Sequence, residues 1–345
     1  MEQNRFHRNF KLNSKSFTSV DELLVYAHNF SDEIYQFLEI WFSQEDFIYV
    51  KTSGSTGIPK EIKLLKVQMI NSAFATGKYF GLLENTSALL CLPTAYIAGK
   101  MMLVRALVLG WQLDVVDAGS NPLKNIEKKY DFSAMVPLQL ENSLKSLHLI
   151  KTLIVGGGVV SNQLQGKLQG FSTTIFATYG MTETITHIAV KKLNNFMIIP
   201  SFYEVLPNVE IYKDVRNCLV INAPKVSNEL VFTNDIVHLI SDTQFEWLGR
   251  FDTIINSGGV KLHPEKIEEK LSKKITSRFF VAGVSDEKLG EKLVLIVEGK
   301  SQPVEINNAN LSKFEIPKEI YFVNKFVETE TKKIQRNKTL DLIKL

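Results

Sequence analysis

The sequence predicts a mixed α/β protein with three parts: a large N-terminal domain built on a mostly parallel sheet, a small antiparallel β-subdomain, and a small α+β C-terminal domain. Three observations support this prediction. In the first half, short β-branched runs alternate with longer segments of helical periodicity, which is typical of a parallel sheet. After about residue 200, short apolar runs are separated by turn residues. From Phe251 onward the pattern is mixed again, so we expect domains at residues 1–250 and 251–345.

Each predicted element follows from its local pattern of apolar and turn residues. The strands of the large domain are Asp46–Val50, Ala88–Leu92, Leu113–Asp117, Phe132–Val136, Thr152–Val155 and Thr173–Ala177, and its helices are Lys66–Phe80, Gly99–Gly110 and Pro137–Leu147. The β-subdomain has the runs Glu210–Tyr212, Cys218–Ile221, Leu230–Thr233 and Val237–Ile240. The C-terminal domain has helices at Pro264–Lys274 and Asn308–Phe314, and strands at Ser277–Val284, Val294–Glu298 and Glu319–Val323.

Composition excludes several classes of protein. The 40 basic and 37 acidic residues nearly balance, which gives no footprint for nucleic acid or an anionic membrane. The two cysteines, Cys91 and Cys218, lie far apart, so neither a disulfide framework nor a structural zinc site is expected. The longest apolar stretch, Met101–Trp111, is too short for a bilayer, and the polar N-terminus has no apolar signal region. We therefore expect a cytoplasmic protein without stable membrane insertion.

A loop rich in glycine and hydroxyl groups follows the first predicted strand. It reads Thr52-Ser53-Gly54-Ser55-Thr56-Gly57-Ile58-Pro59-Lys60. Glycines let the backbone turn tightly and present N–H groups to an anion, while the hydroxyls and Lys60 add donors and a cation. It is not a Walker A loop, because Pro59 precedes the lysine and Glu61 follows it. A Ser/Gly surface turn is the alternative, but the density of donors favours a site for polyphosphate.

The order of residues in this loop resembles the phosphate loop of the adenylate-forming superfamily, which includes acyl-CoA synthetases, peptide-synthetase adenylation domains and luciferases. Glu61 departs from that pattern, which usually has glycine there. The resemblance implies that ATP is a substrate and that residues Thr52 to Lys60 bind its phosphates. It also implies two half-reactions at one site, in which a carboxylic acid is first adenylated and then transferred to a thiol, with CoA as the co-substrate.

The segment Thr178–Thr184 resembles the superfamily's Tyr-Gly-x-Thr-Glu motif. By this resemblance Tyr179 stacks on adenine beside Gly180, Thr182 binds a phosphate oxygen, and Glu183 is a ligand for Mg²⁺, which prefers hard oxygen ligands. Two further matches complete the expected nucleotide site. Gly156, Gly157 and Gly158 resemble the glycine turn beside adenine, and Asp235 resembles the aspartate that binds both ribose hydroxyls, with Asn234 replacing the usual glycine. Ordinary turns are the alternative for each motif alone.

The remaining motifs lie in the C-terminal third. Gly249-Arg250-Phe251-Asp252 resembles Gly-Arg-x-Asp, which implies that Arg250 contacts ribose or phosphate and that Asp252 is the hinge of a mobile C-terminal domain. Gly258 and Gly259 would line the tunnel for the thiol. Lys333 takes the place of the lysine essential for adenylation, although Lys332 stands where glycine is expected.

The acid is less strongly indicated. The segments Leu92–Gly99, Met135–Leu140 and Ile154–Gly158 resemble the o-succinylbenzoate–CoA ligase branch of menaquinone biosynthesis. Lys100 and Arg105 are candidates for binding the second carboxylate, and Tyr96 and His187 for lining the aromatic pocket. Ordinary surface or packed residues are the alternatives for these four. Another aryl- or acyl-CoA ligase, and an enzyme that loads a carrier protein, also stay open.

The region before the phosphate loop is short for this superfamily. The resemblance therefore implies a shortened N-terminal subdomain, and a homodimer that compensates for it stays open.

Overall fold

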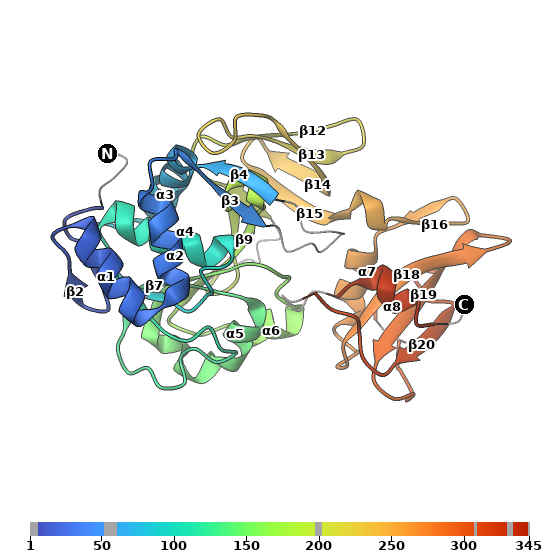
Figure 1. Cartoon of the computed structure of the whole chain (residues 1–345). Helices are drawn as coiled ribbons and strands as arrows, with labels where there is room; N and C mark the ends of the chain where they lie inside the picture. Colours follow the sequence, from blue (N-terminus) through green and yellow to red (C-terminus); the bar gives the residue numbers. More distant parts are fainter. Residues whose placement is uncertain (1–5, 52–60, 197–201, 307–308, 330–333, 344–345) are drawn as a thin grey trace.

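The computed structural model describes residues 6–51, 61–196, 202–306, 309–329 and 334–343 (Figure 1). Its largest element is a thirteen-stranded sheet, with helices on both faces. A smaller five-stranded sheet lies at the C-terminal end of the chain. Within the described ranges, none of the helices has the length and apolar character needed to cross a membrane. The expected mixed α/β class is confirmed.

The large sheet is parallel in one half and antiparallel in the other. Its order is β12-β13-β14-β15-β11-β10-β9-β8-β7-β5-β6-β1-β2, and the strands from β9 to β1 run parallel. The strands are β1 (Lys11–Leu12), β2 (Lys15–Ser16), β5 (Ser87–Leu90), β6 (Gln112–Val115), β7 (Tyr130–Met135), β8 (Ile150–Val155), β9 (Thr174–Gly180), β10 (His187–Lys192), β11 (Tyr203–Val205), β12 (Glu210–Lys213), β13 (Cys218–Asn222), β14 (Val231–Ser241) and β15 (Gln244–Arg250).

The antiparallel half corrects part of the sequence analysis. The predicted β-subdomain continues the large sheet, because β10 pairs antiparallel with both β9 and β11. The runs predicted at Leu230–Thr233 and Val237–Ile240 are one strand, β14. Asn234 and Asp235, for which an ordinary turn was the alternative, lie inside this strand, where Arg216 bonds to the Asn234 side chain.

Two layers of helices cover the sheet. One core layer joins β-strands to α1 (Val20–Phe30), α2 (Asp32–Phe42), α3 (Lys66–Phe80) and α4 (Ile97–Leu109). A second layer joins them to α5 (Pro137–Asn142), η1 (Leu144–Leu149) and α6 (Asn162–Lys167). Ser19 and Ser31 cap α1 and α2 through their hydroxyls, while the left-handed glycines Gly81 and Gly110 end α3 and α4. The helix predicted to reach Leu147 was too long, because a 3₁₀ turn replaces it after Ser143.

The strand predicted at Asp46–Val50 is present as β3 (Phe47–Lys51), but it does not join the large sheet. It forms a separate antiparallel pair with β4 (Glu61–Leu65), and Lys51 lies opposite Glu61. β4 was missed by the sequence analysis, although its alternation of polar and apolar residues fits a strand with one buried face. The pair therefore brings together the two ends of the segment 52–60, which itself lies outside the described residues.

The C-terminal unit is a five-stranded sheet with two short helices. Its elements are η3 (Phe251–Thr253), β16 (Ile255–Ser257), β17 (Val260–Leu262), α7 (Pro264–Leu271), β18 (Phe279–Asp286), β19 (Gly290–Glu298), β20 (Glu319–Val323) and α8 (Arg336–Leu340). The helix predicted at Asn308–Phe314 was wrong for the described residues 309–314, because Asn310 has a φ of 54° and interrupts any right-handed helix. Figure 1 shows this unit beside β15, where Lys266 of α7 bonds to Glu246 at 2.6 Å.

Candidate active site

A buried carboxylate lies at the centre of the site. Asp235 of β14 accepts a hydrogen bond from the Tyr179 hydroxyl at 2.6 Å and another from the Trp247 indole N–H at 3.0 Å. Burial, followed by the charge of Asp235, raises the pKa of Tyr179, so its hydroxyl stays protonated as a donor. A carboxylate has about four acceptor positions. Asp235 is therefore held in one orientation and still has acceptor capacity for a ligand.

A cavity of about 200 Å³ opens beside this carboxylate. It brings together three of the predicted site residues, Gly158, Tyr179 and Asp235. Its walls also contain three residues that the sequence analysis missed: Lys191, Tyr203 and Trp247. The signal for Trp247 was available, since it precedes the Gly-Arg motif in a strand-like run. Lys191 lies at the end of β10, after an apolar run, and burial lowers its pKa.

The glycine turn after β8 has a reason within the protein. A Cβ on Gly156 would lie 2.5 Å from the Thr178 hydroxyl oxygen, so only glycine allows β8 and β9 to approach at this point. Gly157 has a φ of 77°, which also favours glycine. The turn is thus fixed against β9, and Gly158 faces the cavity.

The carboxyl end of β9 carries the Thr182–Glu183 segment. β9 ends at Gly180, and the 3₁₀ turn η2 (Thr182–Thr184) follows. Thr182 is half-buried and Glu183 is exposed. β4, the strand that follows the segment 52–60, packs beside η2. Since ligands of parallel sheets bind at the carboxyl ends of strands, this position suits a phosphate site.

Arg250 and Asp252 are paired with one another. Two hydrogen bonds of 2.8 and 2.7 Å join the guanidinium to the carboxylate. The bonds raise the pKa of Arg250 and lower that of Asp252. Arg250 also lies opposite Asp235 in the β14–β15 ladder, and Asp235 lines the cavity.

The other predicted residues are placed as follows. Gly258 and Gly259 form the turn between β16 and β17, with φ values of 57° and 80°. Thr52, Ser53, Gly54, Ser55, Thr56, Gly57, Lys60 and Lys333 lie outside the described residues. Ile334 follows Lys333 and pairs with Glu328, while Arg336 bonds to Glu268 at 2.8 Å.

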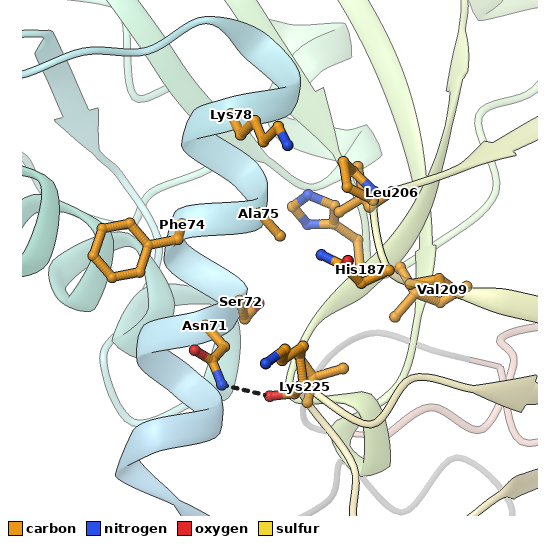
Figure 2. A pocket seen from close by; sticks show the side chains of 13 residues that line it. Asn71, Ser72, Phe74, Ala75, Lys78, His187, Leu206, Val209 and Lys225 are labelled. Atoms are coloured by element: carbon orange, nitrogen blue, oxygen red, sulfur yellow. Dashed lines mark hydrogen bonds between the residues drawn. The ribbon is translucent and has the colours of Figure 1, made fainter.

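A second cavity, of about 180 Å³, lies between α3 and the start of β10 (Figure 2). His187 faces α3 across it, near Ala75. Its walls include Ile188 and Val226, and two cations, Lys78 and Lys225, lie among the lining residues. The described residues that line the two cavities are different.

The four residues predicted for the acid pocket do not all meet. Arg105 and His187 are buried neighbours: burial, followed by the charge of Arg105, lowers the pKa of His187. Nη2 of Arg105 and Nε2 of His187 have no hydrogen-bond partner among the described residues. Of the four, only His187 lines the second cavity. Arg105 is buried behind other residues of the core, while Tyr96 and Lys100 lie at the start of α4, where the Lys100 ammonium bonds to the carbonyl oxygens of Thr94 and Ala95.

Metal binding by the chain alone is not supported by the described residues, which contain no cluster of three or more His, Cys, Asp or Glu side chains suited to a metal ion. Mg²⁺ commonly uses one or two carboxylates and completes its shell with water and substrate phosphates. The single exposed carboxylate of Glu183 fits that mode of binding.

Comparisons with known proteins identify the class and then the family. The chain superimposes on O-succinylbenzoate coenzyme A synthetase from Bacillus subtilis, solved with ATP and magnesium ion, with a TM-score of 0.74 and 19% identity over 95% of this chain and 83% of that chain. This likeness shows that the fold is that of the adenylate-forming enzymes. A model of the AMP-binding enzyme family matches residues 12–217. The chain belongs to this family, and the resemblance found in the sequence is confirmed.

Two further relatives are informative. An acyl-CoA synthetase (AMP-forming)/AMP-acid ligase II-like protein from Dyadobacter fermentans is 36% identical, with a TM-score of 0.61 over 90% of this chain and 93% of that chain. The 2-succinylbenzoate–CoA ligase of a Geobacillus species is 25% identical over 334 residues, which cover 85% of this chain and 68% of that relative.

Proposed function

We propose that the protein is an ATP-dependent acid–thiol ligase that forms an acyl-adenylate and then an acyl-CoA thioester. The observation that carries the proposal is Asp235, which Tyr179 and Trp247 orient beside a cavity at the carboxyl end of β9. Membership of the AMP-binding enzyme family supports the same activity.

In this proposal the first cavity takes the adenosine part of ATP. Asp235 accepts hydrogen bonds from the two ribose hydroxyls, and adenine lies between Tyr179 and the glycine turn at Gly156–Gly158. The phosphates extend over the end of β9 toward Thr182, Glu183 and the loop Thr52–Lys60. Glu183 would hold Mg²⁺, which neutralises phosphate charge when bound. Arg250 lies near enough to Asp235 to contact ribose or phosphate.

The chemistry requires mainly positioning and charge stabilisation. In the first half-reaction a carboxylate oxygen attacks the α-phosphorus of ATP, and pyrophosphate leaves. We propose that Lys333 provides a cation between the carboxylate and the α-phosphate. In the second half-reaction the CoA thiol attacks the adenylate carbonyl carbon, loses its proton, and displaces AMP.

We also propose two domains, residues 1–250 and 251–345, that rotate about Asp252 between the half-reactions. The support is that the second sheet starts at Ile255, just beyond this residue. Polar contacts join the two parts, such as Lys266 with Glu246 and Asn162 with Glu269. Contacts of this kind are exchanged at low cost when domains rotate. Gly258 and Gly259 would then line the path of the pantetheine arm.

We propose 2-succinylbenzoate as the acid, which places the reaction in menaquinone biosynthesis. Relatives named 2-succinylbenzoate–CoA ligase support this choice. The second cavity offers apolar walls for an aromatic ring. His187 lines this cavity with its Nε2 unpaired among the described residues, and the buried charge of Arg105 acts on it, which favours an anion near His187. Another aryl acid would use the same nucleotide site.

The experiment is an assay of the purified chain with ATP, Mg²⁺, CoA and 2-succinylbenzoate, in which pyrophosphate release and the thioester mass are both followed. We expect 2-succinylbenzoyl-CoA, with benzoate and acetate inactive. Pyrophosphate without thioester would redirect the search to a carrier-protein thiol. Thioester with benzoate alone would contradict the acid but not the reaction.

A further inference from the structure

The segment after Glu183 folds as a tight turn centred on Ile185. This residue has φ 66° and ψ −61°, and the Thr186 N–H donates to the Thr184 carbonyl oxygen at 2.7 Å. These values define a γ-turn of the rare, strained kind. A positive φ in a β-branched residue is an outlier that the surrounding structure must enforce.

Burial of the Ile185 side chain and hydrogen bonds within the segment together enforce the turn. The Ile185 side chain is fully buried in the core layer that contains α3 and α4. Its N–H donates to the Thr182 carbonyl oxygen at 3.0 Å. The Thr184 hydroxyl accepts from the Met181 N–H at 3.2 Å, and it lies 3.0 and 2.9 Å from the carbonyl oxygens of Met181 and Thr186, to either of which it can donate. The turn is thus bonded on both sides of Thr182 and Glu183.

On its other side, the turn packs closely against Gly180 at the end of β9. Gly180 lies across the ladder from His187, and a Cβ on Gly180 would lie 2.2 Å from the Thr186 carbonyl oxygen. No larger residue fits without moving the backbone. Met181 to Thr186 therefore form a closed turn, with Glu183 exposed on its outside.

A turn of this shape has no general need for isoleucine, because glycine adopts positive φ without strain. A buried isoleucine side chain packs in the core and so prevents the turn from shifting relative to it. Backbone strain of this kind persists where the surrounding structure fixes it, and it clusters at ligand sites.

We infer that Thr184 and Ile185 are positioning residues, which hold Thr182 and Glu183 in the orientation that binds the phosphates and Mg²⁺ of ATP. The inference rests on the proposed function for the roles of Thr182 and Glu183. Neither positioning residue touches the substrate. Their effect is to remove motions of the phosphate site that binding would otherwise have to arrest.

The test compares Thr184→Val, which keeps the shape and loses the hydroxyl, with Thr184→Ser, which keeps the hydroxyl. Calorimetry on the full chain measures the affinity for adenosine and for ATP with Mg²⁺. We expect Thr184→Val to weaken ATP–Mg²⁺ binding by about fivefold, the typical effect of a lost hydrogen bond between uncharged groups, while adenosine affinity changes by less than about twofold. Thr184→Ser should match the wild type. Ile185→Ala, which removes the buried anchor, should repeat the selective loss.

Three results overturn the inference. Equal losses for adenosine and ATP–Mg²⁺ would mean that these residues only support the fold. A Thr184→Ser variant as weak as Thr184→Val would exclude the hydroxyl. A wild-type chain that gains no affinity from the triphosphate and Mg²⁺ would leave nothing for the turn to position. Failure of the proposed function would give a different result from failure of this inference. No acid would then yield an adenylate, while the variants would still lose affinity for ATP–Mg²⁺ and keep their affinity for adenosine.

Discussion

Replacing Arg105 by methionine should stabilise the protein and damage its recognition of the acid. The guanidinium is 1% exposed, in the middle of α4. Among the described residues its one hydrogen bond is from Nε to the Thr76 hydroxyl, at 3.3 Å, and Nη2 has no partner. The Thr76 hydroxyl also donates to the Ser72 carbonyl oxygen, so it stays bonded after the replacement.

The magnitude follows from the cost of burying the charge. Burial lowers the pKa of Arg105 from 12.5 to about 9. One pKa unit corresponds to about 1.4 kcal/mol, so the charged form costs the folded state on the order of 5 kcal/mol. Lost packing and relaxation reduce the gain, and we expect Arg105→Met to raise the free energy of unfolding by about 1–4 kcal/mol. The pKa of Arg105 is lower in the folded state than in the unfolded state. The destabilisation of the folded state by the buried charge is therefore complete below about pH 9, and it declines as the pH rises from about 9 to 12.5.

The assay is chemical unfolding at pH 7, with Lys145→Met as the control, because Lys145 is an exposed cation whose loss removes the same charge. The control should leave stability unchanged. In the enzyme assay, Arg105→Met should raise KM for the dicarboxylate, because the buried positive charge beside His187 is lost. A less stable Arg105→Met variant would refute the view that this charge is uncompensated in the folded chain.

Three further predictions concern the nucleotide site and the hinge. Lys333→Ala should abolish adenylation, measured as pyrophosphate release, while a supplied acyl-adenylate is still converted to thioester; undiminished adenylation would reject the role of Lys333. Asp252→Pro restricts backbone φ and should impair thioester formation more than adenylation in separate half-reaction assays, so equal losses would count against the hinge. Trp247→Phe removes one of the two donors to Asp235 and should weaken adenosine binding by about tenfold in calorimetry, whereas unchanged affinity would place ribose elsewhere.

The sequence was a good guide where periodicity is strong. The helix predicted at Lys66–Phe80 and the strand at Glu319–Val323 match α3 and β20 residue for residue. It failed where a polar pair separates two predicted runs, as at Asn234-Asp235, because tertiary pairing kept β14 extended. The pairing of strands, including the isolation of β3 with β4, depends on long-range packing that no local pattern specifies.

For the candidate site, the motifs identified residues but not their partners. Tyr179 and Asp235 were chosen separately, and the structure joins them by a hydrogen bond. Trp247 was missed because a tryptophan in a strand usually packs in a core, and its bond to Asp235 arises only from the β14–β15 register. The strained turn at Ile185 could not be read from the sequence at all, since isoleucine is disfavoured at positive φ.

The cavity proposed for the acid and the cavity proposed for adenosine are lined by different residues, which has a consequence for how such a chain can change its substrate. The walls of the second cavity come from α3, the start of β10 and two loops, whereas Asp235 and Trp247 belong to other strands. Replacements at Ala75 or Val209 would alter the acid that fits without disturbing the partners of Asp235. An evolving or engineered enzyme could therefore vary its choice of acid by a few substitutions around the second cavity, while the residues around Asp235 stay unchanged.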